Sequence, residues 1–149
     1  IVICVNKWDT VENPEEELKK WRLLMENEFK FLSYAKVVFV SAKTSKRLST
    51  LMPEIIKANE NHDRLIATNL LNDCIMESVQ MHNPPSYKGK RLKIYFTSQT
   101  SVKPPRFTFE VNNKKLVHFS YSRYLENQIR KTFELDGTPI ILEFKNKND

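Results

Sequence analysis

Glycine is scarce in this sequence, whose 149 residues include only Gly89 and Gly137, far apart in the chain. A phosphate-binding loop of the pattern G-x-x-x-x-G-K-[ST] needs two glycines close together, because its backbone N–H groups must approach the phosphates. Neither that loop nor an Asp-x-x-Gly metal switch can be read in the chain. We therefore expect that these residues do not hydrolyse a nucleotide by themselves.

Cysteine, histidine and long apolar runs are limited as well. The two cysteines are Cys4, in a strand that we expect to be buried, and Cys74, on an expected helix. Neither they nor the three histidines have the spacing of a metal site, so we assign no metal. Unpatterned cysteines are typical of reduced thiols, which indicates a cytoplasmic protein. No segment is long enough to cross a membrane, so we expect no membrane span.

An apolar run over residues 1–5 ends in Asn6-Lys7-Trp8-Asp9. A buried strand followed by Asn-Lys-x-Asp is the pattern of a guanine-reading loop, although a polar turn after a strand is the simpler alternative. The Asp9 carboxylate can accept two parallel hydrogen bonds from guanine, whereas adenine would leave it facing an acceptor. Asn6 can bond the far edge of the base, and the stem of Lys7 can lie across the base plane.

A second apolar strand, residues 36–40, is followed at once by Ser41-Ala42-Lys43, a turn whose N–H groups could bind the guanine carbonyl. One helix is expected between the strands, with Asn13 as N-cap and Pro14 in its first position. Its buried stripe is expected to consist of Leu18, Trp21, Met25, Phe29 and Leu32. Strand, helix and strand form a βαβ unit, which places both loops at one edge of a parallel sheet.

The remaining sequence predicts a second domain, with a boundary that gives 1–62 and 63–149. A helix near Leu51, Ile55 and Ile56 closes the first domain. The second is expected to contain, in order, a helix over 68–81, strands over 91–97 and 106–111, a helix over 121–134 and a strand over 139–144. In the first strand, Leu92, Ile94 and Phe96 should share one face. The order α-β-β-α-β predicts a small sheet with two helices on one face.

The net charge of +6 belongs mostly to the second half, because residues 1–60 carry +1 and residues 61–149 carry +5. This excess is typical of a protein with a phosphate-rich partner, although solvated basic side chains are the simpler explanation. Candidate RNA contacts lie around Gly89, next to Tyr87 and Tyr95, and on two later elements. They are Lys88, Lys90, Arg91, Lys93, Arg106 and Arg123.

Four segments together carry a family resemblance: residues 91–96, 104–107, 118–128 and 137–140. With them, the whole chain resembles the C-terminal part of the bacterial Der (EngA) tandem GTPases. The resemblance implies an α/β fold, in which a truncated P-loop-type GTPase parallel-sheet fragment is followed by a KH-like α-β-β-α-β domain of the α+β class. It also implies GTP or GDP as ligand, with magnesium in the intact protein, and a role in assembly of the large ribosomal subunit.

Residue by residue, the resemblance gives the guanine-reading role to Asn6, Lys7 and Asp9, with Trp8 between them. The turn Ser41-Ala42-Lys43 would complete the base pocket. Partners implied are ribosomal RNA, the large ribosomal subunit and the protein's own GTPase domains. Phosphate and magnesium ligands would lie outside this chain, which opens in mid-strand, so we expect it to be the C-terminal part of a longer protein.

Two departures from the family pattern are visible. The loop after Ser-Ala-x has no glycine over residues 44–47, and the second domain has no G-x-x-G loop, by which true KH domains clamp a nucleic-acid backbone. Two alternatives therefore stay open. The chain could be a stand-alone RNA- or protein-binding module without nucleotide hydrolysis, and the KH-like surface could bind a GTPase domain in place of RNA.

Overall fold

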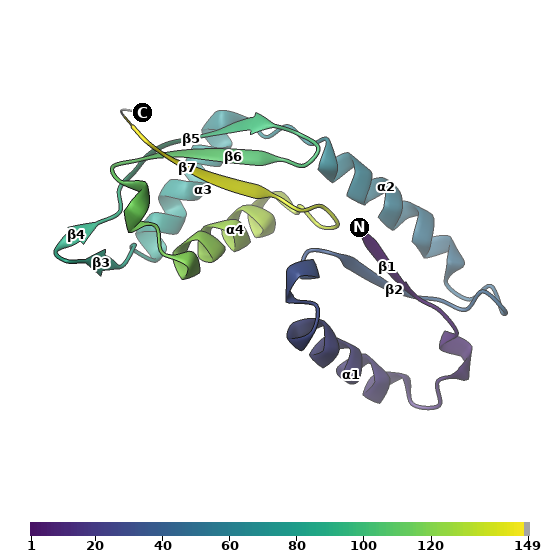
Figure 1. The fold of residues 1–149 in the computed structure, drawn as a ribbon. Coiled ribbons are helices and arrows are strands. Elements are labelled where there is room, and N and C mark those ends of the chain that lie inside the picture. The colour runs from purple at the N-terminus through teal and green to yellow at the C-terminus, as the bar shows by residue number, and fades with distance from the viewer. Residues whose placement is uncertain (148–149) are drawn as a thin grey trace. The chain divides into compact units, whose positions relative to one another are not determined.

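The computed structural model describes residues 1–147, and the chain forms two compact units (Figure 1). Unit 1 consists of Ile1–Asn61 together with the short segment Asp136–Thr138. Unit 2 consists of His62–Leu135 and the residues from Pro139 onward. Both units mix helices with small sheets, as the sequence predicts. Within the described part of the chain, no helix is long and apolar enough to span a membrane.

Unit 1 is built on two parallel strands, β1 (Val2–Val5) and β2 (Lys36–Phe39). Helix α1 (Pro14–Asn27) connects them, and helix α2 (Leu51–His62) follows β2. Parallel neighbours joined through a helix make the βαβ connection that the sequence predicts. Both strands therefore end at the same edge of the sheet, where their following loops meet.

Helix α1 begins as predicted, since the side chain of Asn13 accepts a hydrogen bond from the N–H of Glu16 and Pro14 takes the first position. The helix ends at Asn27, so the prediction that Phe29 and Leu32 continue its buried stripe was wrong. Leu32 belongs to a separate 3₁₀ turn, Lys30–Leu32. The five stripe residues are half-buried, because α1 covers one side of a narrow sheet.

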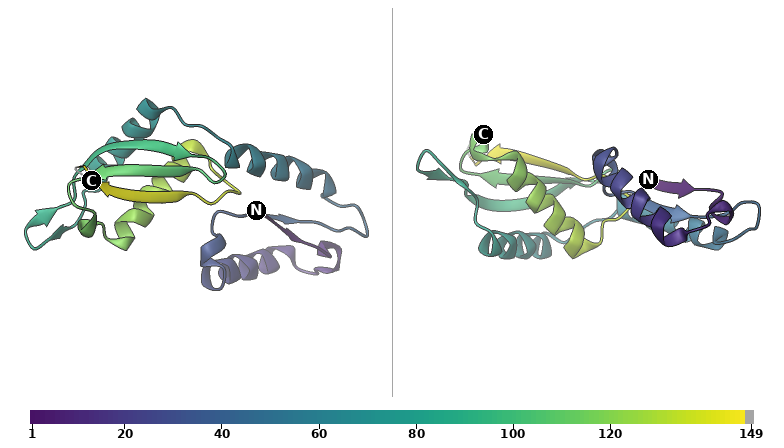
Figure 2. Two further views of the ribbon diagram at one scale, coloured as in Figure 1. Left: turned by 45° about the horizontal axis from the view of Figure 1, so that its top comes forward. Right: turned by 90° about the horizontal axis from the view of Figure 1, so that it is seen from below.

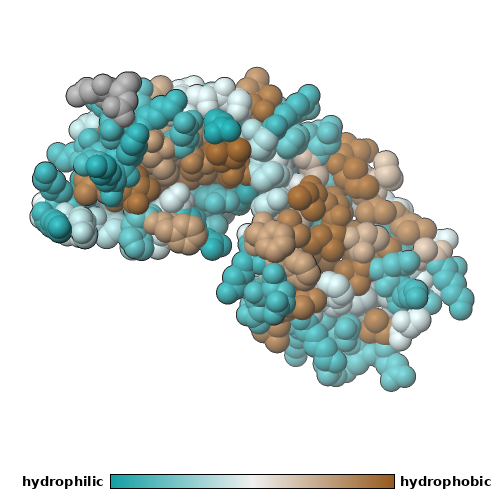
Figure 3. All heavy atoms as spheres, viewed as in Figure 1, coloured by the Kyte–Doolittle hydropathy of each residue, from teal (hydrophilic) through white to brown (hydrophobic). Residues whose placement is uncertain are grey.

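The expectation that Cys4 is buried was wrong. Its side chain is exposed, and Ile3 and Val5 on the opposite face of β1 are half-buried. A continuous apolar run predicts burial on both faces of a strand, but the described part of unit 1 pairs β1 with a single neighbour. Figure 3 shows apolar side chains gathered on the surface of this unit. Ile55 and Ile56 of α2 are among its exposed apolar residues.

Unit 2 contains a three-stranded sheet in the order β5-β6-β7, in which β5 and β6 are antiparallel and β6 and β7 are parallel. A two-stranded hairpin precedes this sheet, and the sequence analysis did not predict it. The elements are α3 (Thr68–Met81), β3 (Ser86–Tyr87), β4 (Lys90–Arg91), β5 (Ile94–Ser101), β6 (Arg106–Val111), α4 (Phe119–Phe133) and β7 (Ile141–Asn146). The views in Figures 1 and 2 place α3 and α4 on one face of the sheet, as predicted.

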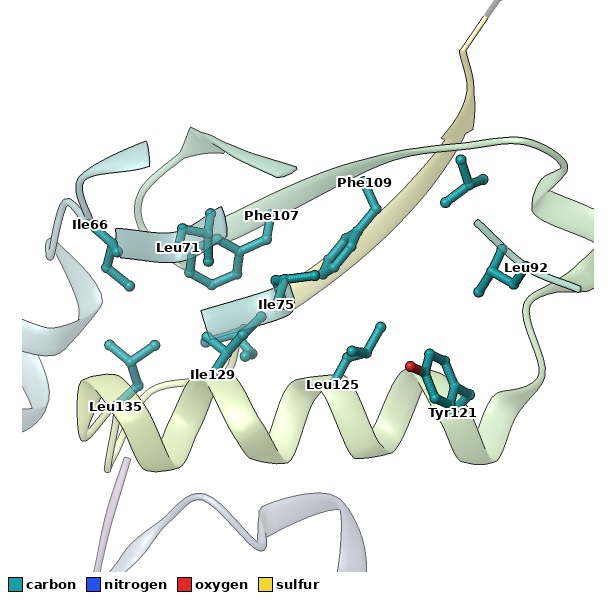
Figure 4. Packing of buried hydrophobic residues seen from close by; sticks show 12 residues of the cluster. Ile66, Leu71, Ile75, Leu92, Phe107, Phe109, Tyr121, Leu125, Ile129 and Leu135 are labelled. Carbon is teal, nitrogen blue, oxygen red and sulfur yellow. The ribbon is translucent and has the colours of Figure 1, made fainter. Parts of the chain in front are cut away.

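The core of unit 2 lies between the two helices and the sheet (Figure 4). Strand β6 contributes alternate residues that are completely buried, and the helices contribute residues at spacings of four. The main members are Leu71, Ile75, Phe107, Phe109, Val111, Tyr121, Leu125 and Ile129. Truncating one such side chain to alanine typically costs about 2–5 kcal/mol, so this cluster holds the unit together.

The predicted inward face of the first strand was wrong at Phe96, which is 43% exposed. Ile94 lies opposite Val111, but Phe96 lies opposite Glu110, so Tyr95 is an extra residue on β5. A bulge of this kind reverses the alternation of side chains beyond it. As a result Thr97 is buried in place of Phe96.

Asn72 of α3 holds the outer edge of β5 at this bulge. Its Nδ2 donates to the carbonyl oxygen of Thr97 at 2.8 Å, and its Oδ1 accepts from the N–H of Thr97 at 2.9 Å. One side-chain amide thus satisfies both main-chain groups of one strand residue.

The second helix of unit 2 starts two residues before the predicted position, 121. Helix α4 begins at Phe119, because the side chain of His118 accepts a hydrogen bond from the N–H of Ser120 and caps the helix. The histidine ring takes the place of the hydroxyl or carboxyl cap that a sequence search looks for.

Candidate functional site

The loop after β1 folds back tightly. Lys7 adopts a left-handed backbone conformation with φ of 62°, and a 3₁₀ turn follows over Trp8–Thr10. The N–H and the hydroxyl of Thr10 both donate to the carbonyl oxygen of Lys7, at 3.0 and 2.9 Å. This turn places Asn6 and Asp9 on the exposed side of the loop.

The two predicted motifs meet at the edge of the parallel sheet. The N–H of Ala42 donates to Oδ1 of Asn6 at 3.0 Å, across 36 residues of sequence. The hydroxyl of Ser41 donates to Oδ1 of Asp9 at 2.5 Å, across 32 residues. Asn6, Asp9 and the turn Ser41-Ala42-Lys43 therefore form one cluster, as the βαβ geometry predicts.

Ser41 is the buried centre of this cluster. Its N–H donates to the carbonyl oxygen of Lys46 at 3.0 Å, and its Oγ accepts from the N–H of Thr44 at 3.2 Å. Sequence reasoning gave Ser41 a role through its backbone, and missed that its hydroxyl holds Asp9. The presence of a hydroxyl residue in the Ser-Ala-Lys turn was the signal that could have indicated it.

The pKa of the Asp9 carboxyl lies below its usual value, chiefly because the hydroxyl of Ser41 donates a hydrogen bond to the carboxylate. The positive charge of Lys43 lowers it further, by a smaller amount. Asp9 is therefore a carboxylate at neutral pH, and its side chain is exposed to solvent.

Trp8 points the other way, into unit 1. Its side chain is 6% exposed, and the centre of its ring lies 4.4 Å from that of Phe39. The main-chain N–H of Trp8 donates to the carbonyl oxygen of Val40 at 3.0 Å. The ring of Trp8 thus anchors the loop to β2 and leaves the surface to Asn6, Lys7 and Asp9.

The loop that lacks the family's glycine carries backbone strain. Ser45 and Arg47 have φ of 57° and 60°, values that L-residues with a side chain rarely adopt. The chain follows a path suited to glycine, although it contains none over residues 44–47. The cluster at Ser41 therefore forms without the glycine.

The six basic candidates do not form one group. Lys90, Arg91 and Lys93 line a single hollow next to the β3–β4 turn, which Lys88 occupies with Gly89. Arg106 on β6 forms an ion pair with Glu143 at 3.9 Å. Arg123 on α4 lies 5.7 Å from the ring centre of Phe119. In the described part of the chain, no group of three or more potential metal ligands occurs.

Comparison with known proteins identifies the family. Residues 65–145 match the family described as the KH-domain-like region of EngA bacterial GTPase enzymes, C-terminal. The chain belongs to this family. The matched segment runs from α3 to the last but one residue of β7, so it includes both helices and nearly all of the three-stranded sheet of unit 2.

Individual relatives extend the similarity over unit 1. The chain is 48% identical over 149 residues to the GTPase Der of Halalkalibacterium halodurans, which is 100% of this chain and 34% of that protein. It is 51% identical over 142 residues to the GTPase Der of Oceanobacillus iheyensis, covering 95% of this chain and 33% of that protein. The chain thus spans about a third of the length of the curated relatives it matches, and it is homologous to their C-terminal region.

Proposed function

We propose that unit 1 recognises the base of GTP or GDP as part of a Der-type GTPase. The proposal rests on two hydrogen bonds that join the motifs, one from the hydroxyl of Ser41 to Asp9 and one from the N–H of Ala42 to Asn6. In this proposal residues 1–62 are the end of a P-loop-type GTPase domain and residues 63–149 are the KH-like domain. The relatives named GTPase Der support it.

The geometry suits guanine for a specific reason. The exposed Asp9 carboxylate presents Oδ2 and the remaining lone pairs of Oδ1 to two parallel N–H donors, which guanine has and adenine lacks. The hydroxyl of Ser41 fixes the orientation of this carboxylate, so Ser41 acts as a positioning residue. Asn6 accepts from the N–H of Ala42 and keeps its Nδ2 for the far edge of the base. The N–H groups of Ser41 and Ala42 are already bonded, to Lys46 and to Asn6, so the turn offers the base the N–H of Lys43.

Phosphate binding and hydrolysis are assigned to the whole protein. When bound, magnesium would neutralise charge on the β- and γ-phosphates. Residues 1–147 offer no cluster of ligands for it, so we derive no step through the metal from these residues. The chain's own contribution is selection of the base.

For unit 2 we propose binding to ribosomal RNA on the large ribosomal subunit, in the cytoplasm. The charge of +5 over residues 61–149 supports this, since a basic surface attracts the phosphate backbone. The absence of a G-x-x-G loop means that the contact would not use the KH-type backbone clamp.

Replacing Asp9 tests the guanine assignment in the full-length protein. Asp9→Asn should weaken the binding of GDP by about 100-fold, because an amide cannot accept hydrogen bonds from both N–H donors of guanine. The same variant should bind xanthosine diphosphate more tightly, because the carbonyl that xanthine has at this position can accept a hydrogen bond from the new amide. Asp73→Asn, a change of equal charge on the exposed side of α3, is the matched control. Unchanged preference between the two nucleotides in Asp9→Asn would contradict the proposal.

A further inference from the structure

The segment that holds the β3–β4 hairpin has an unbalanced charge. Between Ser86 and Ile94 it contains four basic residues, Lys88, Lys90, Arg91 and Lys93, and no acidic one. None of the four forms an ion pair among residues 1–147, whereas Lys20, Lys103, Arg106 and Arg130 each have a carboxylate partner. Positive charges that lack a partner repel each other and attract an anion.

A hollow of about 390 Å³ lies beside this hairpin. Three of the basic residues line it, together with Gly89, and Asn112, Asn113 and Leu116 complete it. A volume of this size is in the range of small-molecule sites. In Figure 3 the end of the unit that carries β3 and β4 is covered by hydrophilic side chains.

Hydrogen bonds with Asn112 fix the backbone of the segment that lines the hollow. The side chain of Asn112 donates to the carbonyl oxygen of Arg91 at 3.0 Å and accepts from the N–H of Lys93 at 2.9 Å. Leu92, between these two residues, is buried in the core. Since alternate residues of an extended segment point to the same side, Arg91 and Lys93 are directed away from the core together. Their backbones are therefore preorganised before any ligand binds.

The amide oxygens in the hollow already have donors. Oδ1 of Asn112 accepts from the N–H of Lys93, and Oδ1 of Asn113 accepts from the N–H of Lys115, both at 2.9 Å. The groups left for a ligand are the three cations, the remaining amide N–H groups of the two asparagines and the apolar side of Leu116. Cations and N–H donors suit phosphate oxygens, and contacts to phosphate do not depend on nucleotide sequence.

The turn leaves room for close approach. Gly89 has φ of 73°, and a Cβ placed on it would meet nothing within 4 Å. Tyr87 and Tyr95 near the hairpin are exposed, and each has a lysine ammonium over its ring, Lys88 at 5.5 Å and Lys147 at 4.8 Å. Exposed aromatic rings among cations are the combination that binds unpaired nucleotides by stacking and charge.

We propose that this hollow binds the phosphate backbone of an unpaired RNA segment, with Lys90, Arg91 and Lys93 on the phosphates. Tyr87 offers a ring for stacking of one base, and Leu116 offers an apolar wall to a ribose. The inference rests on the RNA-binding role proposed above and specifies where that role resides. Arg106 and Arg123, which lie on other elements and have partners of their own, do not belong to this site.

The first test measures binding of the whole chain to a fluorescent single-stranded oligouridine RNA at several salt concentrations. The triple variant Lys90→Gln, Arg91→Gln, Lys93→Gln should reduce the slope of log affinity against log salt by about 2, at about 0.7 for each lost phosphate contact. The control triple variant, Lys30→Gln, Lys36→Gln, Lys57→Gln, removes the same charge from exposed positions of unit 1 and should keep the slope. Equal slopes in the two variants would overturn the placement of the site.

A second variant adds charge without disturbing the fold. In Asn113→Asp the new carboxylate can still accept from the N–H of Lys115, while it adds a negative charge to the hollow. We expect affinity for the RNA to fall about fivefold at low salt, and Asn127→Asp on the exposed side of α4 to change it less than twofold. Loss in both variants alike would contradict the site, whereas a parent chain that binds no RNA would overturn the proposed RNA-binding function itself.

Discussion

Gly137 and Ala58 lie against each other so closely that a Cβ on Gly137 would sit 2.5 Å from the Cβ of Ala58. Both belong to unit 1, into which the Asp136–Thr138 turn inserts. The turn is fixed on both sides, because the N–H of Gly137 donates to the carbonyl oxygen of Tyr34 at 2.7 Å and Nδ2 of Asn61 donates to that of Asp136 at 2.9 Å.

Gly137→Ala should therefore destabilise unit 1 by about 2–5 kcal/mol, since it adds a clash to the strain of φ at 80°. Gly89→Ala is the matched control, because its φ of 73° is similar but open space surrounds it. Gly89→Ala should lower the free energy of unfolding by about 1–2 kcal/mol, and this loss should fall on unit 2, which contains Gly89. Urea unfolding followed by tryptophan fluorescence reports unit 1, which contains both Trp8 and Trp21. No change of its midpoint in Gly137→Ala would contradict the contact.

The strained loop after Ser41 offers a stabilising substitution. Arg47→Gly should raise the free energy of unfolding by about 0.5 kcal/mol, because relief of the left-handed strain exceeds the entropy cost of glycine. Lys46→Gly, one residue earlier and without a positive φ, should lower it by about 0.5–1 kcal/mol. The same fluorescence assay compares them, and a loss of stability in both would show that the loop is not strained at Arg47.

Removal of the Ser41 hydroxyl should change the titration of Asp9. In the parent chain the carboxyl should titrate below 3.8, and in Ser41→Ala its pKa should rise toward that value. Because the folded-state pKa is the lower one, the stabilisation is present above the unfolded pKa and is lost as pH falls through the folded value. The pKa of Asp9 can be measured from the NMR shift of its carboxyl carbon against pH, with Ser49→Ala as the control. If the pKa is the same in Ser41→Ala as in the parent chain, the hydroxyl of Ser41 is not the cause of the shift.

Ionisation of Tyr121 should lower the stability of unit 2 at alkaline pH. Burial raises the pKa of its phenol to about 12, and its hydroxyl donates to the carbonyl oxygen of His82 at 2.9 Å. Since the unfolded phenol ionises near 10, stability should be complete below pH 10 and fall as pH rises from about 10 to 12. Tyr121→Phe should cost about 1 kcal/mol at neutral pH and reduce this alkaline loss. Urea unfolding by circular dichroism at several pH values compares the two, and equal pH dependence would refute the assignment.

Long periodic segments were predictable from the sequence. Strand β6 forms at the predicted residues, and its alternate side chains Phe107, Phe109 and Val111 are all completely buried. Helix α3 likewise forms over the predicted range and buries Leu71 and Ile75. In these segments propensity, periodicity and packing all favour the same structure, so the pattern alone is sufficient.

The predictions failed where tertiary contacts, and not the local sequence, determine the structure. The bulge at Tyr95 depends on pairing with β6, and nothing local in the sequence marks it. The β3–β4 hairpin has two residue pairs, too few to give a periodic signal. At the candidate site, the spacing of motifs predicted which residues meet, but the hydrogen bond from Ser41 to Asp9 required the geometry of the sheet edge.

The amide of Asn72 has a consequence for the behaviour of the chain in concentrated solution. Strand β5 is an outer strand, and an outer strand can recruit a strand from another molecule through its free backbone groups. At Thr97 both of these groups are already occupied by Asn72. The helix thereby supplies a one-residue substitute for a neighbouring strand, and it protects this edge from intermolecular β-pairing where the bulge would otherwise leave it open.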